Sequence, residues 1–323
     1  MDRAARTDTF HAEPRRLRLK FLAAFRLGLL SCLFVALVLT GCGGGFGAEQ
    51  TSGASFTPSS SINDVTFDES AATGENGALI DTSHVAEGYV GVSATSQARL
   101  KLIVTSGDAT YNYDIPEDAT PAFAPLTFGN GTYQFRVMQN TSGSNYVELC
   151  STTADVELES EFAPYLRPSI ICNYSEDSAC VAKARELVAD ATTQAEAVKD
   201  ICEWVVQNVS YDSDKAAELA DATGYISDPD ETLSSGKGIC LDYAALGAAM
   251  LRSQNVPTQI VTGYVSPDGI YHAWIMVYID GTWTSAQFKV SANTWSRVDL
   301  TFAASGSGGT VGDGKEYTDR FVY

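Results

Sequence analysis

The spacing of apolar residues changes near the middle of the chain. Between residues 64 and 166, apolar and β-branched residues alternate with polar ones in short runs, which is typical of strands. Turn signals such as Gly107-Asp108 and Asn130-Gly131 separate these runs. The pattern predicts a small antiparallel β-sandwich domain over residues 64–166. Its expected strands cover residues 88–95, 99–105, 110–115 and 132–138.

After residue 166 the spacing becomes that of helices followed by strands. Thr193 and Glu196 form a capping box, and apolar residues follow them at the spacing of one helix face. The pattern predicts helices over residues 179–189, from 193 onward and over 241–252, and then strands over 258–265, 271–279 and 282–288. Helices followed by antiparallel strands indicate an α+β domain over residues 167–323.

The first 41 residues have the pattern of a leader. An Arg-rich start precedes an apolar run over residues 27–39, which is shorter than the roughly 20 residues needed to cross a bilayer. The run ends in Leu39-Thr40-Gly41-Cys42, which resembles the lipobox of bacterial lipoproteins. This resemblance implies a lipid on Cys42 and an extracytoplasmic protein anchored to the cell membrane. The alternative is an uncleaved anchor helix with a chance cysteine. The Gly/Ser-rich residues 42–63 predict a flexible tether.

Charge and composition exclude several classes of function. The chain has 323 residues, with 21 Lys and Arg against 40 Asp and Glu, and a net charge of −19 argues against a nucleic-acid partner. Because seven of the basic residues lie in the leader, the rest of the chain is more acidic still. No phosphate loop, dinucleotide fingerprint or zinc-ligand spacing occurs, so we expect no cofactor and no metal. The acidic run Asp228–Glu231 lacks the spacing of a calcium loop and is expected to be a solvated loop.

Three residues of the second domain are candidates for catalysis. A Gly-rich loop brings Cys240 to the start of a predicted helix, where free N–H groups and the helix dipole stabilise a thiolate and an oxyanion. His272, in a predicted strand, is the only histidine after His84. Together with Asp299 they suggest a nucleophile, a base and an orienting carboxylate. Taken singly, residues of these types are more often a buried cysteine, a structural histidine and a solvated carboxylate.

Three segments together resemble the transglutaminase-like superfamily over about residues 165–323: GICLDYAAL, HAWIMVYIDGTW and WSRVDLTF. The resemblance implies a papain-like transglutaminase core with the chain order Cys, His, Asp. It assigns Cys240 as the nucleophile, His272 as the base and Asp299 as the residue that orients the base. Two departures weaken the third assignment: Leu300 stands where the family often has proline, and Asp299 comes later than usual. Gln287 is therefore the alternative partner of His272.

The chemistry that the resemblance implies is acyl transfer through a thioester on Cys240. Peptide or glutamine amide bonds of proteins or cell-wall peptides would be the substrates, and the outcome would be crosslinking, deamidation or proteolysis. The alternative is a non-catalytic cell-surface binding or adhesion module with a transglutaminase-like domain. The sequence predicts no particular oligomeric state.

The cysteine count agrees with one reactive thiol. Of the seven cysteines, Cys32 lies in the leader and Cys42 is the predicted lipidation site. In an oxidising compartment, four of the remaining five can pair in three ways, which leaves one free thiol. We expect Cys240 to be the free one. The candidates for disulfide bonds are Cys150, Cys172, Cys180 and Cys202, the last of which has the alternative of an unpaired core cysteine.

Overall fold

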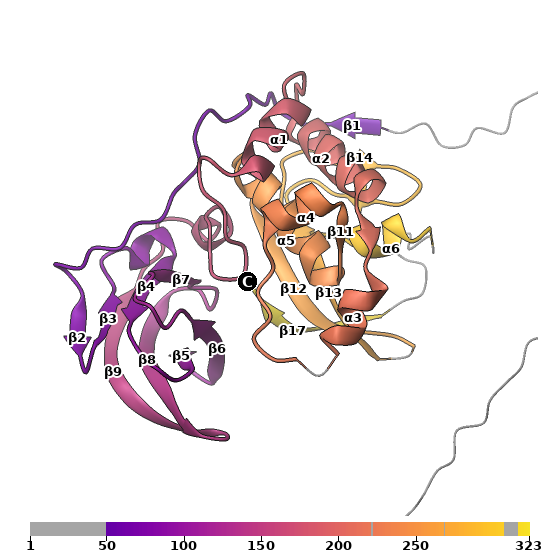
Figure 1. Ribbon diagram of the computed structural model, residues 1–323. Helices are drawn as coiled ribbons and strands as arrows, with labels where there is room; N and C mark the ends of the chain where they lie inside the picture. The colour runs from indigo at the N-terminus through magenta and orange to yellow at the C-terminus, as the bar shows by residue number, and fades with distance from the viewer. Residues whose placement is uncertain (1–49, 221, 268, 307–315) are drawn as a thin grey trace, which may run out of the picture. The chain divides into compact units, whose positions relative to one another are not determined.

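The computed structural model describes residues 50–220, 222–267, 269–306 and 316–323. The predicted leader and the predicted lipidation site at Cys42 lie outside the described residues. The chain is α+β, with a strand-rich part followed by a part in which helices pack on a sheet (Figure 1). Among the helices that the structure describes, none is long and apolar enough to cross a membrane.

Two antiparallel sheets form the strand-rich part, as the alternating pattern predicted. Their strand orders are β2-β3-β4-β7 and β6-β5-β8-β9. In β5, Leu100, Leu102 and Val104 are buried, while the residues between them are partly exposed, so one face of the strand points into the core. The strands are β2 (Thr73–Glu75), β3 (Ala78–Asp81), β4 (Tyr89–Ala94), β5 (Leu100–Ser106), β6 (Ala109–Ile115), β7 (Ala122–Pro125), β8 (Gly131–Ser142) and β9 (Asn145–Val156).

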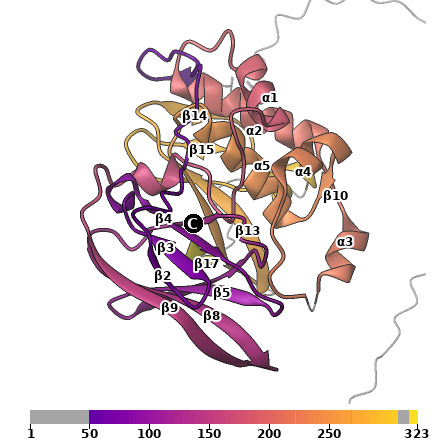
Figure 2. The same cartoon turned by 60° about the vertical axis from the view of Figure 1, so that its left-hand side comes forward.

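The pattern of apolar residues did not predict the long strand β9. Only Cys150 and Val156 are buried among its 12 residues, and the other ten are partly or fully exposed. It is held by pairing along its length with β8, with which it forms an extended hairpin (Figure 2). Backbone pairing of this kind needs no apolar alternation, so the sequence carries little signal for the strand.

The second part has a four-stranded antiparallel sheet of order β16-β13-β12-β17. Helix α5 packs against β12 and β13, and Figures 1 and 2 both show it lying along these strands. Its residues from Asp242 to Arg252 are all buried. Small residues make this possible: a Cβ on Gly247 would lie 2.6 Å from Leu300 Cδ1. The elements are α1 (Ala179–Leu187), α2 (Gln194–Asn208), α5 (Cys240–Arg252), α6 (Leu300–Ala304), β12 (Thr258–Val265), β13 (Ile270–Val277), β14 (Thr282–Thr284), β15 (Lys289–Val290), β16 (Ser296–Val298) and β17 (Tyr317–Val322).

The expectation of a flexible tether over residues 42–63 is wrong for its described portion. Strand β1 (Gln50–Ser52) pairs antiparallel with β14, and Phe56 N donates to Thr192 O at 2.7 Å. Phe56 and Ile62 pack against the core of the helical part. These two apolar side chains and the exposed edge of β14 give the segment the burial and pairing that its Gly/Ser content did not suggest.

The acidic run at residues 228–231 is also corrected, because it begins a helix. Asp228 caps α4 (Pro229–Ser235) by accepting hydrogen bonds from Asp230 N and Glu231 N. Asp230 accepts from Ala179 N at 2.9 Å and from Cys180 N at 2.8 Å, at the start of α1. These carboxylates satisfy backbone donors at two helix N-termini and are not a solvated loop. A further unpredicted helix, α3, covers Ser213–Glu218.

The predicted disulfide bonds are not found. All five cysteines of the described residues are free, and the four proposed to pair are buried as small apolar side chains: Cys150, Cys172, Cys180 and Cys202. Cys150 belongs to the sandwich core and the other three to the helical core. Burial raises the pKa of the Cys150 thiol, and it raises the pKa of Cys172 to about 11, so neither is a ready nucleophile. Cys240 is the one thiol in this set that is not fully buried.

Candidate active site

The structure brings the three predicted catalytic residues together from three elements. Cys240 is the first residue of α5, as the Gly-rich loop before it predicted, and His272 lies in β13. Asp299 is the N-cap of α6 and directly follows β16. Because β16 pairs with β13 through Val298 and Ile275, the sheet register carries Asp299 to the strand that holds His272. Cys240 and His272 line the same cavity of about 330 Å³.

His272 and Asp299 form a buried pair. His272 Nε2 lies 2.9 Å from Asp299 Oδ2, and the two side chains are only 5% and 6% exposed. Since a carboxylate only accepts, Nε2 carries the proton in this hydrogen bond. The Cys240 side chain is close enough to the imidazole to contribute to the raised pKa of His272. With Nε2 engaged by Asp299, Nδ1 is the nitrogen left for Cys240, which is the arrangement that a base between a nucleophile and an orienting carboxylate requires.

The surroundings of His272 favour its charged form. Burial by itself lowers the pKa of the imidazole, but the hydrogen bonds with Asp299 and Cys240 and the charges of both groups outweigh burial and raise the pKa to about 9. A protonated His272 therefore places a positive charge on the wall of the cavity that Cys240 also lines, and a positive charge attracts an anionic group at short range.

Asp299 is held in place by its remaining hydrogen bonds. Its Oδ1 accepts from Phe302 N at 3.0 Å, which caps α6, and its Oδ2 accepts from Tyr317 Oη at 2.8 Å. The ring of Phe302 stacks on the imidazole of His272 at 4.4 Å between centroids. The carboxylate and the imidazole are therefore both fixed by groups outside the three predicted residues.

Tyr317 and Phe302 were not found by sequence reasoning. Phe302 stands in the motif after Asp299, at the spacing at which an N-cap meets the third helical residue, and that spacing was the available signal. Tyr317 lies in β17, remote in the chain, and no motif surrounds it. Its ring packs edge-on against Trp274 at 4.9 Å and lies 3.5 Å from Arg297 Cζ, so a cation–π contact fixes the phenol that reaches Asp299.

Gln287, the alternative partner of His272, takes no part in this pair. Its Nε2 donates to Ala303 O at 3.2 Å, so the side-chain amide is bonded to the end of α6. The choice that the sequence left open between Asp299 and Gln287 is therefore decided by the geometry in favour of Asp299.

The loop before Cys240 depends on two glycines. Gly236 ends α4 in the left-handed region, with φ of 62°. Gly238 lies so close to α5 that a Cβ there would be 2.5 Å from Asp242 Cβ. The carboxylate of Asp242 in turn accepts a hydrogen bond from Ile239 N at 2.9 Å. The first turn of α5 therefore holds the residue before Cys240 in place.

The mouth of the Cys240 cavity is apolar. Tyr211, Ile270 and Tyr271 line it and are 47%, 54% and 48% exposed, which places three of the large exposed apolar side chains around one nucleophile. Apart from Cys240 and His272, every side chain lining this cavity is uncharged. Such a mouth fits an uncharged segment of a ligand.

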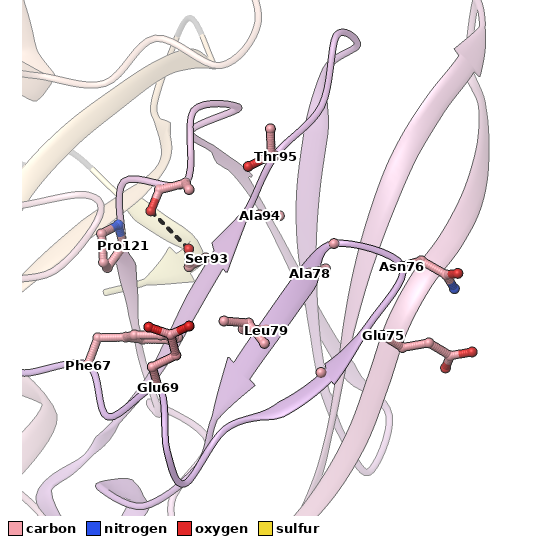
Figure 3. A pocket seen from close by; sticks show the side chains of 13 residues that line it. Phe67, Glu69, Glu75, Asn76, Ala78, Leu79, Ser93, Ala94, Thr95 and Pro121 are labelled. Atoms are coloured by element: carbon pink, nitrogen blue, oxygen red, sulfur yellow. Dashed lines mark hydrogen bonds between the residues drawn. The ribbon is translucent and has the colours of Figure 1, made fainter.

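A larger hollow lies in the strand-rich part and has a different character. It measures about 650 Å³ and is lined from β2, β3 and β4 together with residues 67, 69, 119 and 121 (Figure 3). Ser93 Oγ donates to Ala119 O at 2.9 Å across its wall. Neither histidine nor cysteine lines it, so it lacks the thiol and the imidazole that meet beside Cys240. In the described part of the chain, no group of acidic, histidine and cysteine side chains is placed to hold a metal ion.

Part of the chain is similar to known proteins. Residues 181–299 match the model of the transglutaminase-like superfamily. A UPF0252 protein of Methanocaldococcus jannaschii is 32% identical over 94 residues, which are 27% of each chain. An uncharacterized protein of Mycobacterium leprae is 26% identical over 156 residues, which cover 45% of this chain and 50% of that protein.

These matches are partial. The chain spans between about a quarter and a half of the length of the curated relatives that it matches. A solved structure of a presumed cysteine protease from Cytophaga hutchinsonii is 16% identical, covers 76% of this chain and 83% of its own, and has a TM-score of 0.33. The family assignment therefore rests on the matched segment, which includes Cys240, His272 and Asp299.

Proposed function

Because residues 181–299 belong to the transglutaminase-like superfamily, we propose that the protein is a thiol enzyme that acts on peptide or glutamine amide bonds through a thioester on Cys240. The observation that carries this proposal is the buried His272–Asp299 pair, which holds an imidazole against the one partly exposed thiol of the described residues. An isolated structural histidine would have no need of an orienting carboxylate on one nitrogen and a thiol on the other.

The proposed reaction has two halves. In the first, the Cys240 thiolate attacks the amide carbonyl carbon, the C–N bond breaks, and the His272 imidazolium gives its proton to the leaving amine or ammonia. In the second, water or a primary amine attacks the thioester, His272 takes a proton from the attacking group, and the C–S bond breaks to release the thiolate. The N–H groups at the start of α5 are suited to stabilise the oxyanion of both tetrahedral intermediates.

Asp299 has the role of keeping the imidazole in one orientation through both halves. It accepts a hydrogen bond from Nε2–H, so Nδ1 stays directed at sulfur and at the group that leaves or attacks. The capping bond from Phe302 N and the bond from Tyr317 Oη prevent the carboxylate from turning away. The stacked ring of Phe302 limits tilting of the imidazole.

The cavity mouth points to the class of acyl donor. Tyr211, Ile270 and Tyr271 give apolar contact area, and no carboxylate lines the cavity to receive a cationic side chain. We therefore favour donors with uncharged residues beside the reacting amide. Proteins or cell-wall peptides outside the cell membrane would be the substrates if the leader and the lipid at Cys42 are as the sequence predicts.

One incubation separates the possible outcomes. Protein lacking the leader is mixed with a glutamine-bearing peptide, with and without a primary amine, and the products are analysed by mass spectrometry. Amine incorporation identifies crosslinking, a gain of about 1 Da identifies deamidation, and fragments identify proteolysis. A Cys240→Ala variant is the control and is expected to be inert. An unchanged peptide together with a Cys240 thiol that iodoacetamide labels slowly, with or without His272, would contradict the proposal and support a non-catalytic binding module.

A further inference from the structure

A buried ion pair lies beside the proposed nucleophile and takes no part in the reaction described above. Asp242 is fully buried, two residues after Cys240 in α5. Lys215 of α3 places its Nζ 2.8 Å from Asp242 Oδ2. A buried carboxylate is costly unless it is fully paired, so its position beside a thiol calls for a reason.

The carboxylate is fully paired. Its Oδ2 accepts from Ile239 N and from Lys215 Nζ, and its Oδ1 accepts from Tyr225 Oη and from Ser227 Oγ. These partners come from the nucleophile loop, from α3 and from residues 225–227. One side chain thus joins three segments to the first turn of the helix that bears the thiol.

The same oxygen links the lysine to the nucleophile. Asp242 Oδ2 bonds Lys215 on one side and the backbone N–H of Ile239, the residue before Cys240, on the other. Gly238 allows the loop to approach α5 this closely, because a Cβ at this position would clash with Asp242 Cβ. We propose that the Lys215–Asp242 pair positions Cys240 and, because it is neutral as a unit, leaves the positive end of α5 available to the Cys240 thiolate.

The electrostatic part of the proposal follows from the helix end. A lone carboxylate in the first turn of α5 would neutralise the positive end of the helix dipole. It would also repel a thiolate two residues away. Lys215 cancels this repulsion. The other ionisable groups facing the thiol are His272 with its partner Asp299, and Tyr211; Tyr225 faces the carboxylate. None of these replaces Lys215 as a permanent positive charge, because the charge of His272 depends on pH.

The test rests on the proposed function only in taking Cys240 as the reactive thiol. It measures the reactivity of this thiol directly. The rate of iodoacetamide labelling of Cys240 is followed by peptide mass spectrometry from pH 4 to pH 10. In Lys215→Met the midpoint of this profile is expected to rise by about one pH unit, with labelling about tenfold slower below the midpoint. In Asp242→Asn it is expected to fall by a similar amount, and in the double variant it should return toward that of the wild type.

The opposite shifts of the labelling midpoint in the two single variants distinguish a positioning role from a purely structural one. If Lys215→Met and Asp242→Asn both lower the melting temperature but leave the labelling midpoint unchanged, the pair is only structural and the inference is overturned. Asp230→Asn is the matched control, because Asp230 also bonds backbone N–H groups at a helix start. It should lower the melting temperature without moving the midpoint.

The experiment also allows for a variant that does not fold, and it separates failure of this inference from failure of the proposed function. If Asp242→Asn does not fold, Lys215→Met still decides the question, since Lys215 is partly exposed and its loss leaves the bond from Ile239 N to Asp242 in place. If wild-type Cys240 labels slowly and its rate does not depend on His272, the proposed function fails. If labelling is fast and depends on His272 but ignores Lys215, only the present inference fails.

Discussion

The strand-rich part and the helical part each contain a hollow, and the larger of the two is lined by no thiol and no imidazole. The hollow over β2, β3 and β4 measures about 650 Å³, against about 330 Å³ beside Cys240. The larger one is lined mainly by strand side chains and two carboxylates, those of Glu69 and Glu75. The smaller one joins the end of a helix to a strand and a short helical turn, and these contribute a thiol, an imidazole and, behind them, a carboxylate.

The comparison shows that architecture matters more than volume. A helix N-terminus offers free N–H groups and a positive dipole end, whereas a sheet face has its backbone groups paired and only a small dipole. An antiparallel register fixes which side chains meet across strands, and here it delivers Asp299 to His272. The following predictions test whether the chemistry is confined to the helical part.

The largest expected effect is that of removing the thiol. Cys240→Ser should lower turnover of a susceptible peptide by at least about 10⁴-fold, since the step that needs a thiolate is lost. Turnover is measured by mass spectrometry under equal enzyme concentrations. Cys202→Ser, which alters a buried thiol of the same part of the chain, is the comparison variant and should retain activity in whatever fraction folds. Equal losses in both variants would show that the site lies elsewhere.

The orienting carboxylate comes next. Asp299→Asn should lower kcat by about 10²–10⁴-fold, because an amide in that place no longer holds the imidazole in one orientation and one tautomer. Gln287→Ala should leave kcat within about threefold, since Gln287 bonds Ala303 O and not His272. Steady-state kinetics of both variants measures the difference. A larger loss for Gln287→Ala than for Asp299→Asn would reverse the assignment.

The His272 pair should also appear in the pH dependence of stability. The folded pKa of about 9 lies above the unfolded value of 6.5, so the pair stabilises the fold fully below pH 6.5 and loses this contribution as the pH rises toward 9. The size is about 3 kcal/mol. Urea unfolding of the wild type and of His272→Gln at pH 6 and pH 9.5 gives the measurement: the difference between the two proteins should shrink at the higher pH. A constant difference would contradict the raised pKa.

The smallest effect on the site is expected from the other hollow. Phe67→Ala removes a ring that lies against Gly91 in the strand-rich part and should cost about 1–3 kcal/mol of stability. Labelling of Cys240 by iodoacetamide should not change. Denaturant unfolding and the labelling rate are measured on the same preparation. A changed labelling rate in folded protein would mean that the strand-rich part contributes to the site.

Much of this fold and part of the site can be predicted from the sequence. Alternation over β5 and β8, the capping box of α2 and the Gly-rich start of α5 are local signals, because each depends on residues within one turn or one strand. Cys240 and His272 stand out for the same reason. Strand β9 has only two buried residues, and the pairing of residues 50–52 and the capping role of Asp230 depend on partners far along the chain, so none of the three carried such a signal.

The sequence by itself determined which residue types are available: one cysteine at a helix start, one histidine in the second part, and a choice between Asp299 and Gln287. Tertiary structure alone decided that Asp299 meets His272, that Tyr317 fixes this carboxylate, and that the remaining thiols are buried and unpaired. The physical reason is the separation along the chain between the residues that interact. Helix starts and strand alternation are set by neighbouring residues, whereas contacts across a sheet follow from its register and from the packing of α5 upon it.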